Sequence, residues 1–465
     1  MNVPIIISGG GIIGNYISVR LKRHNIESLI IEKSSETQAY SSGIRTLTLN
    51  NHSLSLLQKE KIEVETAPID QINALDGEGT GRIKFLSDDI GENFLSHVVM
   101  FNELKNKLAK ACHERTVFNN QIESIQNLNQ NDTNEVLLSN GTSIEAKIIA
   151  GCDGRKSNVA KISGLSNKSS EYNQTAITFI CKADKNFDRK IAHQVFSEKG
   201  IFAVMPMPDR ESRDNRCTIV WSVNNKNLEG LSINDFVSSN LSFFESKLGI
   251  KLKIDSQLLN FQLSNHHFEN YVNNSIVLIG DAAHSIHPLA GQGINIGFAD
   301  ADIFCEEVVD AYNKGMSINE KSVLKKYEIR RKGVNLIMLK SMDFFVYFFN
   351  DNNSYIRLIR SYGLNTVNKT NVIKAIFKCF EENTAIGEII NIGSGKPRTL
   401  KQIILSIRKS IGQGKPLFGI VKLRKDEILK LYPSINKAKK KIQWTPKIQF
   451  NKGVKDTIYY YKKNL

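Results

Sequence analysis

Residues 5–14 read Ile5-Ile6-Ile7-Ser8-Gly9-Gly10-Gly11-Ile12-Ile13-Gly14, and this stretch decides the expected fold. The three consecutive isoleucines predict a buried parallel strand, and the glycines after them fit the pattern GxGxxG. Apolar residues in the next segment indicate a helix, and the run Ser28-Leu29-Ile30-Ile31 predicts a second strand. A strand, a glycine turn, a helix and a strand form the first unit of a Rossmann-like α/β domain.

The glycine turn has the residues that a dinucleotide site needs. Gly9 makes the tight turn, Gly11 lets a pyrophosphate approach the backbone, and Gly14 lets the helix pack closely on the strand. The helix then begins at Ile12 and Ile13, where free N–H groups and a partial positive charge favour phosphates.

The second strand ends in an acidic residue, as a dinucleotide site requires. Glu32 follows Gly14 by 18 positions and can accept hydrogen bonds from ribose hydroxyls, and Lys33 stands beside it. A glycine turn without a ligand is the alternative interpretation, and the turn itself does not distinguish FAD from NAD.

Two further motifs each follow a buried strand. Gly151-Cys152-Asp153-Gly154 follows the strand at 148–150, and residues 280–295 follow the strand at 276–279. The second motif reads Gly280-Asp281-Ala282-Ala283-His284-Ser285-Ile286-His287-Pro288-Leu289-Ala290-Gly291-Gln292-Gly293-Ile294-Asn295.

In this order the three motifs resemble those of the group A flavoprotein monooxygenases, and most closely the ring hydroxylases of ubiquinone biosynthesis. That family has GxGxxG near the N-terminus, a DG motif in mid-chain and the signature GDAAHxxHPLAGQGxNxG. The resemblance covers about residues 3–380. It departs at Asn102 and Ala160, where the family usually has arginine.

The resemblance implies FAD as cofactor. Asp281 is suited to the ribityl hydroxyls, Pro288 to the flavin face, and the loop at 290–293 to the pyrimidine edge, at the start of a helix. By resemblance, Asp153 contacts both FAD and the nicotinamide cofactor, and Arg45 contacts FAD. The expected cofactor residues are Gly9, Gly11, Ile12, Ile13, Gly14, Glu32, Lys33, Arg45, Asp153, Gly280, Asp281, Pro288, Gly291, Gln292, Gly293, Ile294 and Asn295.

The resemblance also implies the reaction. FAD reduced by NAD(P)H would use O₂ to hydroxylate an aromatic ring, here a polyprenyl phenol of quinone biosynthesis. No catalytic side chain is assigned, since the cofactor carries the chemistry. A flavin oxidoreductase on another aromatic or polyprenyl substrate, and a chimeric chain that binds FAD without turnover, stay open as alternatives.

Two groups of residues have competing interpretations. His284 and His287 lie inside the flavin signature without a carboxylate in register, so we expect structural roles and no metal. Phe196, Phe202, Met205 and Met207 would wall an apolar substrate pocket, or would be plain sheet core.

Composition limits the partners. The net charge of +15 fits nucleic acid, an anionic membrane or phosphate ligands, but the lysines are spread along the chain, so we favour a compositional bias and expect no nucleic acid. The six cysteines form no CxxC pair. With neither a signal peptide nor an apolar span, we expect a cytoplasmic protein with at most peripheral contact to the inner membrane, and by resemblance a partner in a quinone-biosynthesis complex.

The expected architecture is α/β, with a Rossmann-like FAD-binding domain interleaved with a mixed β-sheet substrate domain. The FAD-binding domain would comprise residues 1–75, 95–175 and 265–330, and the substrate domain residues 76–94 and 176–264. Residues 331–380 would form C-terminal helices, and residues 381–465 a small appended α/β segment.

The appended segment resembles another family. Residues 387–395, Arg424 and Trp444-Thr445-Pro446 are similar to the C-terminal part of nucleotide-sugar epimerases and dehydratases. Because the Rossmann half of those enzymes is missing from it, we expect a non-catalytic appendage. The run Lys437-Ala438-Lys439-Lys440-Lys441 indicates a solvated helix face more than a membrane patch.

Overall fold

The computed structural model describes residues 2–40, 43–79, 81–128, 133–208, 215–286, 291–350, 390–416, 418, 433–446, 449–455 and 458. The chain divides into two units. Unit 1 comprises Met1–Glu78 and Asn93–Asn352, and unit 2 comprises Gly79–Glu92 and Asn353–Leu465.

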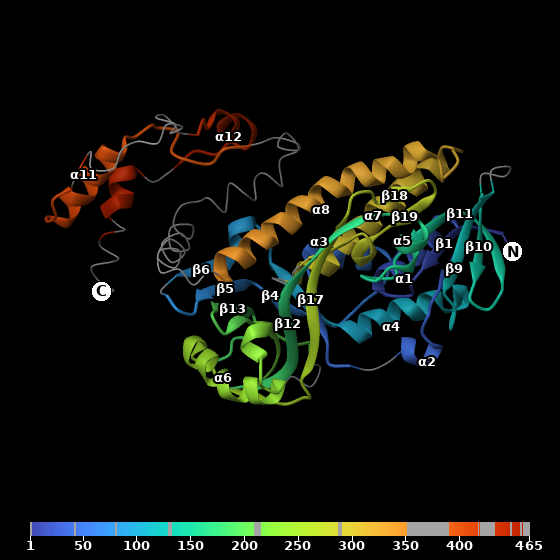
Figure 1. Ribbon diagram of the computed structural model, residues 1–465, viewed down its shortest axis with the longest axis horizontal. Helices are drawn as coiled ribbons and strands as arrows, with labels where there is room; N and C mark the ends of the chain where they lie inside the picture. Colours follow the sequence, from blue (N-terminus) through green and yellow to red (C-terminus); the bar gives the residue numbers. More distant parts are fainter. Residues whose placement is uncertain are drawn as a thin grey trace. The chain divides into compact units, whose positions relative to one another are not determined.

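A parallel sheet in unit 1 carries the glycine turn (Figure 1). β1 (Asn2–Ser8) leads through the turn into α1 (Ile12–Arg23), and β2 (Ser28–Ile31) returns parallel to β1. The strand, turn, helix and strand expected from the sequence are therefore confirmed. The parallel part continues through β8 (Thr116–Val117), which pairs with β2, and through β11 (Ser143–Gly151) and β19 (Ile276–Leu278) on the other side of β1. Antiparallel strands then join β11 and β19.

Close packing in this sheet explains its sequence. Ile5, Ile6 and Ile7 are fully buried, as expected of a strand with both faces covered. A Cβ atom added to Gly14 would lie 2.1 Å from the carbonyl oxygen of Gly9, so only glycine fits where α1 meets the turn.

A second, mostly antiparallel sheet forms the middle of unit 1. Its strand order is β17 (Leu259–Phe268), β12 (Asn167–Ala183), β15 (Arg216–Asn224), β14 (Gly200–Pro206) and β13 (Ile191–Ser197), with β5 (Gln71–Asp76) parallel to β13. β12 and β17 run side by side as two long arrows in Figure 1.

One face of this sheet is a hydrophobic core under α6 (Ile233–Leu248). Phe202 from β14 stacks on Phe244 from α6 with ring centroids 4.2 Å apart, and Trp221 packs edge-on against both rings. Phe202 is fully buried there, so it belongs to the sheet core rather than to a pocket wall.

A third, small sheet joins β3 (Thr46–Leu49), β7 (Ser96–Met100) and β4 (Ala67–Ile69). The pattern of residues 95–112 predicts a helix with Leu104, Leu108 and Ala109 on one face. The helix α4 (Phe101–Cys112) begins only at residue 101, because residues 96–100 pair with β3 and β4, and its buried face holds these three residues.

The other helices and strands of unit 1 complete these layers. They are α2 (Glu36–Ala39), α3 (Asn51–Lys59), β9 (Ile122–Leu128), β10 (Thr133–Leu138), α5 (Asn158–Ile162), β16 (Leu252–Ile254), β18 (Val272–Asn273), β20 (His284–Ser285), α7 (Gln292–Asn313) and α8 (Lys321–Asn350). The alternation of residues 136–152 predicts a hairpin that turns at Asn140-Gly141, and β10 and β11 form it.

Unit 2 contains β6 (Arg82–Leu86), α11 (Leu400–Ile411) and α12 (Asn436–Lys441). A small cluster of Ile435, Ala438, Ile442 and Trp444 packs with Ile390 and Ile392. The sequence from about residue 381 predicts a strand, a turn and a helix, but residues 390–392 do not form a strand, and Arg424 lies outside the described residues. Lys437, Lys439 and Lys440 of α12 are exposed around the buried Ala438.

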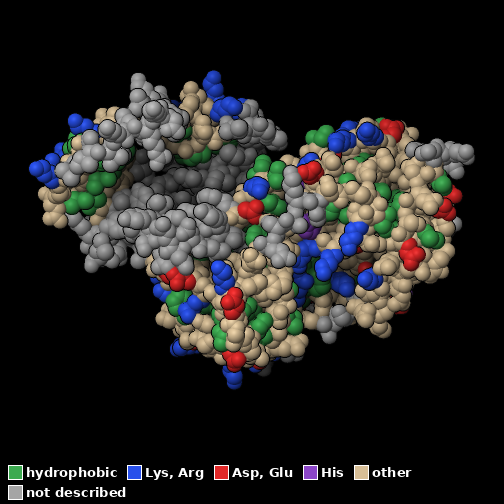
Figure 2. Space-filling model, in the orientation of Figure 1, with side chains coloured by type: hydrophobic (Ala, Val, Ile, Leu, Met, Phe, Trp, Pro, Cys, Tyr) green, Lys and Arg blue, Asp and Glu red, His purple; other side chains and the backbone are tan. Residues whose placement is uncertain are grey.

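In Figure 2, Lys and Arg side chains are scattered over the visible face, with one group to the right of the centre. Within the described parts of the chain, no helix combines the length and apolarity that crossing a membrane requires.

Candidate cofactor and substrate site

A cavity of about 650 Å³ in unit 1 brings most of the predicted cofactor residues together. It lies at the carboxyl ends of β1, β2 and β11 and extends to the face of the antiparallel sheet opposite α6. The predicted residues that line it are Gly9, Gly11, Ile12, Ile13, Glu32, Arg45, Asp153, Asp281, Gly291, Gly293, Ile294 and Asn295.

The remaining predicted residues lie elsewhere. Gly14 and Gly280 are next to the cavity but not in its lining, and Lys33 points to solvent. Gln292 begins α7, and its side chain is outside the described part of the molecule. Pro288 and His287 also lie outside the described residues.

The Glu32 carboxylate is fixed beside the glycine turn. Its Oε2 accepts a hydrogen bond of 2.6 Å from the backbone N–H of Gly10, and its Oε1 accepts one of 2.8 Å from the N–H of Ser34. A Cβ atom at Gly11 would meet no atom within 4 Å, so the turn leaves open space in front of α1. The N-terminus of α1 therefore faces a space that can accept a phosphate.

Asp153 has one engaged and one free oxygen. Its Oδ2 accepts hydrogen bonds from the N–H groups of Asn158 and Val159 at 2.7 and 3.2 Å. Its Oδ1 is buried at the cavity and has no hydrogen-bond partner among the described residues. A buried carboxylate oxygen of this kind is expected to take a donor from a ligand.

Opposite charges meet in the middle of the cavity. The Arg45 guanidinium lies over the rings of Phe101 and Phe261, 5.0 and 5.7 Å from their centroids. Burial lowers the pKa of Arg45, while the charge of Asp281 opposes that change. Burial raises the pKa of Asp281, against the charges of His284, Arg155 and Arg45.

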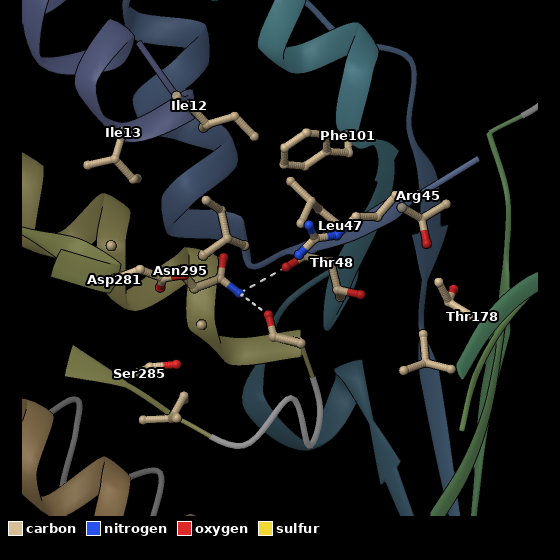
Figure 3. Close-up of a pocket in the computed structure, with 18 of the residues that line it drawn as sticks. Ile12, Ile13, Arg45, Leu47, Thr48, Phe101, Thr178, Asp281, Ser285 and Asn295 are labelled. Atoms are coloured by element: carbon tan, nitrogen blue, oxygen red, sulfur yellow. Dashed lines mark hydrogen bonds between the residues drawn. The ribbon is translucent and has the colours of Figure 1, made fainter. Parts of the chain in front are cut away.

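The N-terminus of α7 is attached to β3 by one side chain. Asn295 Nδ2 donates to the carbonyl oxygens of Thr48 and Gly291 at 2.9 and 3.2 Å, and its Oδ1 accepts from the N–H of Asn50 at 2.9 Å (Figure 3). Gly291 has a φ of +64°, which favours glycine, and a Cβ there would lie 2.9 Å from Thr48 Cβ. The start of α7 is thereby held against the cavity, with Gly293 open to it.

Behind Asp281 lies a buried polar network that is centred on Asp300 of α7. Asp300 is fully buried, and its Oδ2 lies 2.5 Å from His284 Nε2 and accepts from the N–H of Gly280 at 3.2 Å. Its Oδ1 accepts from Arg331 Nε at 2.6 Å and from Asn335 Nδ2 at 3.0 Å, both from α8.

The network determines the charge of Asp300. Burial would raise its pKa, but the charge and hydrogen bond of His284, then Arg331 and Asn335, outweigh burial and lower the pKa to about 2. His284 is therefore paired with the Asp300 carboxylate, so the expectation that no carboxylate lies in register with it is wrong. The contacts of Asp300 with Arg331 and Asn335 come from α8, a helix that no motif marks.

The cavity continues beyond the cofactor residues into a chamber with mainly apolar walls. Ile201, Ala203 and Met205 of β14 face it, whereas the alternating Phe202 and Val204 face the core under α6. Of the four residues considered for an apolar pocket, Met205 thus lines the cavity, and Phe196, Phe202 and Met207 do not. Ile69, Ile72, Ser96 and Thr178 also line this part.

Comparison with known proteins agrees with this geometry. Residues 2–340 match the model of a family described as FAD binding domain. The chain belongs to this FAD-binding family.

Relatives of this chain include a hydroxylase and a monooxygenase. The 3-demethoxyubiquinol 3-hydroxylase of Escherichia coli (strain K12) is 27% identical over 383 residues, which cover 80% of this chain and 96% of that protein. The mitochondrial ubiquinone biosynthesis monooxygenase COQ6 of Dictyostelium discoideum is 26% identical, over 80% of this chain and 89% of its own. The fold also matches the crystal structure of p-nitrophenol 4-monooxygenase PnpA from Pseudomonas putida DLL-E4, with a TM-score of 0.67 at 16% identity, over 82% of this chain and 98% of that one.

The described residues of this FAD-binding chain fit the cofactor that its family implies. The open space at Gly11 and Gly293 leaves room for a ligand against two helix N-termini. Asp153 Oδ1, which has no partner among the described residues, and the Asp281 carboxylate offer acceptors for hydroxyl or N–H groups inside the same cavity.

Proposed function

We propose that this chain is a FAD-dependent monooxygenase that hydroxylates the ring of a polyprenyl phenol in quinone biosynthesis, with NAD(P)H and O₂. The observation that carries the proposal is the continuity of one cavity. Its nucleotide end is polar and glycine-rich, and its far end is an apolar chamber between two sheets. The relatives named 3-demethoxyubiquinol 3-hydroxylase and ubiquinone biosynthesis monooxygenase support the same reaction class.

We assign the cofactor contacts by position along the cavity. The N-terminus of α1 at Gly11 would face the pyrophosphate, and Glu32 would accept the adenosine ribose hydroxyls. Asp281 would face the ribityl chain, and residues 291–295 the pyrimidine edge of the flavin. FAD bound there supplies electron transfer from NAD(P)H and activation of O₂.

The side chains around this site position the reactants and exclude water. Asn295 holds the start of α7 against β3, so that the helix N-terminus keeps its direction toward the cavity. The Asp300 network holds the backbone N–H of Gly280 and, through it, the direction of the Asp281 side chain. Apolar walls from β14 keep the chamber dry, which strengthens electrostatic interactions inside it.

Coupled turnover tests the proposal. FAD-loaded protein is mixed with NADH or NADPH and with a prenylated phenol, and hydroxylated product and hydrogen peroxide are both measured. We expect product formation to account for most of the NAD(P)H that is oxidised. Peroxide without product, for every phenol offered, would favour a FAD-binding chain without this turnover.

We further propose peripheral contact with the inner membrane and membership of a quinone-biosynthesis complex, because a polyprenyl substrate partitions into lipid. Residues 381–465 are proposed as a non-catalytic appendage related to the end of nucleotide-sugar epimerases. Calorimetry of the full chain with UDP-glucose tests this assignment: no heat of binding is expected, and tight binding that is lost in Arg424→Ala would contradict it.

A further inference from the structure

The apolar chamber contains a buried hydroxyl without a partner. Ser96 opens β7, lines the cavity and is 8% exposed. Its Oγ is buried and has no hydrogen-bond partner among the residues that the structure describes. A buried hydroxyl left unpaired is unfavourable, so a group that pairs with it on binding gains affinity.

Neighbouring hydroxyls of the chamber are already engaged. Thr178 Oγ1 donates to the carbonyl oxygen of Ile219 at 2.9 Å, and Thr46 Oγ1 bonds Thr218 Oγ1 at 3.2 Å. Thr48 Oγ1 donates a hydrogen bond of 3.4 Å to the sulfur of Met205. Ser96 therefore differs from the three threonines that line the same space, because its buried hydroxyl has no hydrogen-bond partner among the described residues.

The position of Ser96 connects it to the cofactor end of the cavity. β3 and β7 pair as far as Leu49 and His97, and the next residues beyond this pair are Asn50 and Ser96. The N–H of Asn50 binds Asn295 at the start of α7. On its other side β7 pairs with β4, where Ile69 is the partner of Ser96. Ile69 gives the chamber an apolar wall beside the hydroxyl.

We propose that Ser96 is the substrate-binding residue that recognises the ring hydroxyl of the phenol. This inference rests on the proposed function and names a specificity determinant within it. A serine hydroxyl can donate to and accept from a phenol, and the surrounding Ile69, Ile72 and Met205 contact the ring and its apolar substituent. Ser96 thereby orients the ring and selects a phenol over an arene that lacks the oxygen.

Equilibrium binding of two probes tests the role. The FAD-loaded full chain is titrated, without NAD(P)H, with 2-geranylphenol and with geranylbenzene, which lacks the hydroxyl. Ser96→Ala is compared with Ser53→Ala. Ser53 is also buried, and its Oγ has no partner among the described residues, but it lies outside the cavity lining. Flavin content is measured for each variant to establish that the cofactor site is intact.

We expect Ser96→Ala to weaken binding of 2-geranylphenol by about threefold to tenfold. Geranylbenzene should bind Ser96→Ala as it binds the unmodified protein, and Ser53→Ala should keep the full preference for the phenol. A preference for 2-geranylphenol over geranylbenzene that persists in Ser96→Ala would overturn the role of Ser96 and leave the proposed function standing. If neither probe binds the unmodified protein, the substrate class of the proposed function fails, and the inference fails with it.

Discussion

Replacing Asp300 by alanine tests the buried network behind the cofactor site. The carboxylate accepts from four groups: Gly280 N, His284 Nε2, Arg331 Nε and Asn335 Nδ2. Asp300→Ala leaves all four buried without that acceptor, and Arg331 loses its buried charge partner. Breaking a buried ion pair from one side typically costs about 3–5 kcal/mol of the free energy of unfolding, so we expect a loss in that range.

The same helix offers a matched control. Asp310 of α7 pairs with Lys314 at 2.6 Å, but both side chains are about half exposed to solvent. Asp310→Ala should therefore lower the free energy of unfolding by about 0.5 kcal/mol or less. Urea unfolding followed by far-ultraviolet circular dichroism measures both variants. A loss below about 1 kcal/mol in Asp300→Ala, close to that of Asp310→Ala, would refute the network account.

The pH dependence of stability gives a second readout of Asp300. Its pKa is lowered from 3.8 to about 2 in the folded protein. The charged carboxylate thus stabilises the fold by about 2 kcal/mol above pH 4, and this contribution is lost as the pH falls from about 4 to about 2. Between these values, the unmodified protein should lose stability more steeply than Asp300→Ala does.

Three further predictions concern Glu32 and Gly14 at the glycine turn, and His267. Glu32→Ala should weaken FAD binding by about 10- to 100-fold, since it removes an ionised acceptor, whereas the exposed Glu27→Ala should not; equal flavin content after desalting would count against the ribose role. Gly14→Ala should destabilise the fold by more than about 2 kcal/mol, because the added Cβ would lie 2.1 Å from the carbonyl oxygen of Gly9. Gly333→Ala, which has open space on α8, should be neutral or stabilising in thermal unfolding. Similar melting temperatures of the two variants would exclude the clash. Burial lowers the pKa of His267 to about 4, so the unfolded chain binds the proton first and stability falls as the pH drops from 6.5 toward 4. His267→Asn should make the urea midpoint depend less on pH in this range. An unchanged slope would argue against this contribution of His267.

Local patterns predicted the nucleotide end of the site well. The order Ile5 to Gly14 gives a strand, a turn and a helix within one stretch of chain, and the close approach of Gly14 to Gly9 is short-range. The start of α4 was harder to predict. Met100 precedes the helix and makes no side-chain cap, so no capping residue marks where β7 ends.

Long-range contacts account for what the sequence did not predict. Alternation along β14 shows that Phe202 and Met205 face opposite sides, but only the packing of α6 determines which side is core. The unpartnered state of Ser96, and the contact of Asp300 with Arg331, depend on strands and helices brought together by the fold. No spacing within the chain indicates either.

Isotope labelling tests the central claim most directly. FAD-loaded protein turns over a prenylated phenol with NAD(P)H under ¹⁸O₂ in ordinary water, and the product is analysed by mass spectrometry. The account predicts a hydroxylated ring that carries one ¹⁸O atom from O₂, and an unlabelled hydroxyl when the label is in the water instead. A product that takes its oxygen from water, or NAD(P)H oxidation without an oxygenated product, would contradict it.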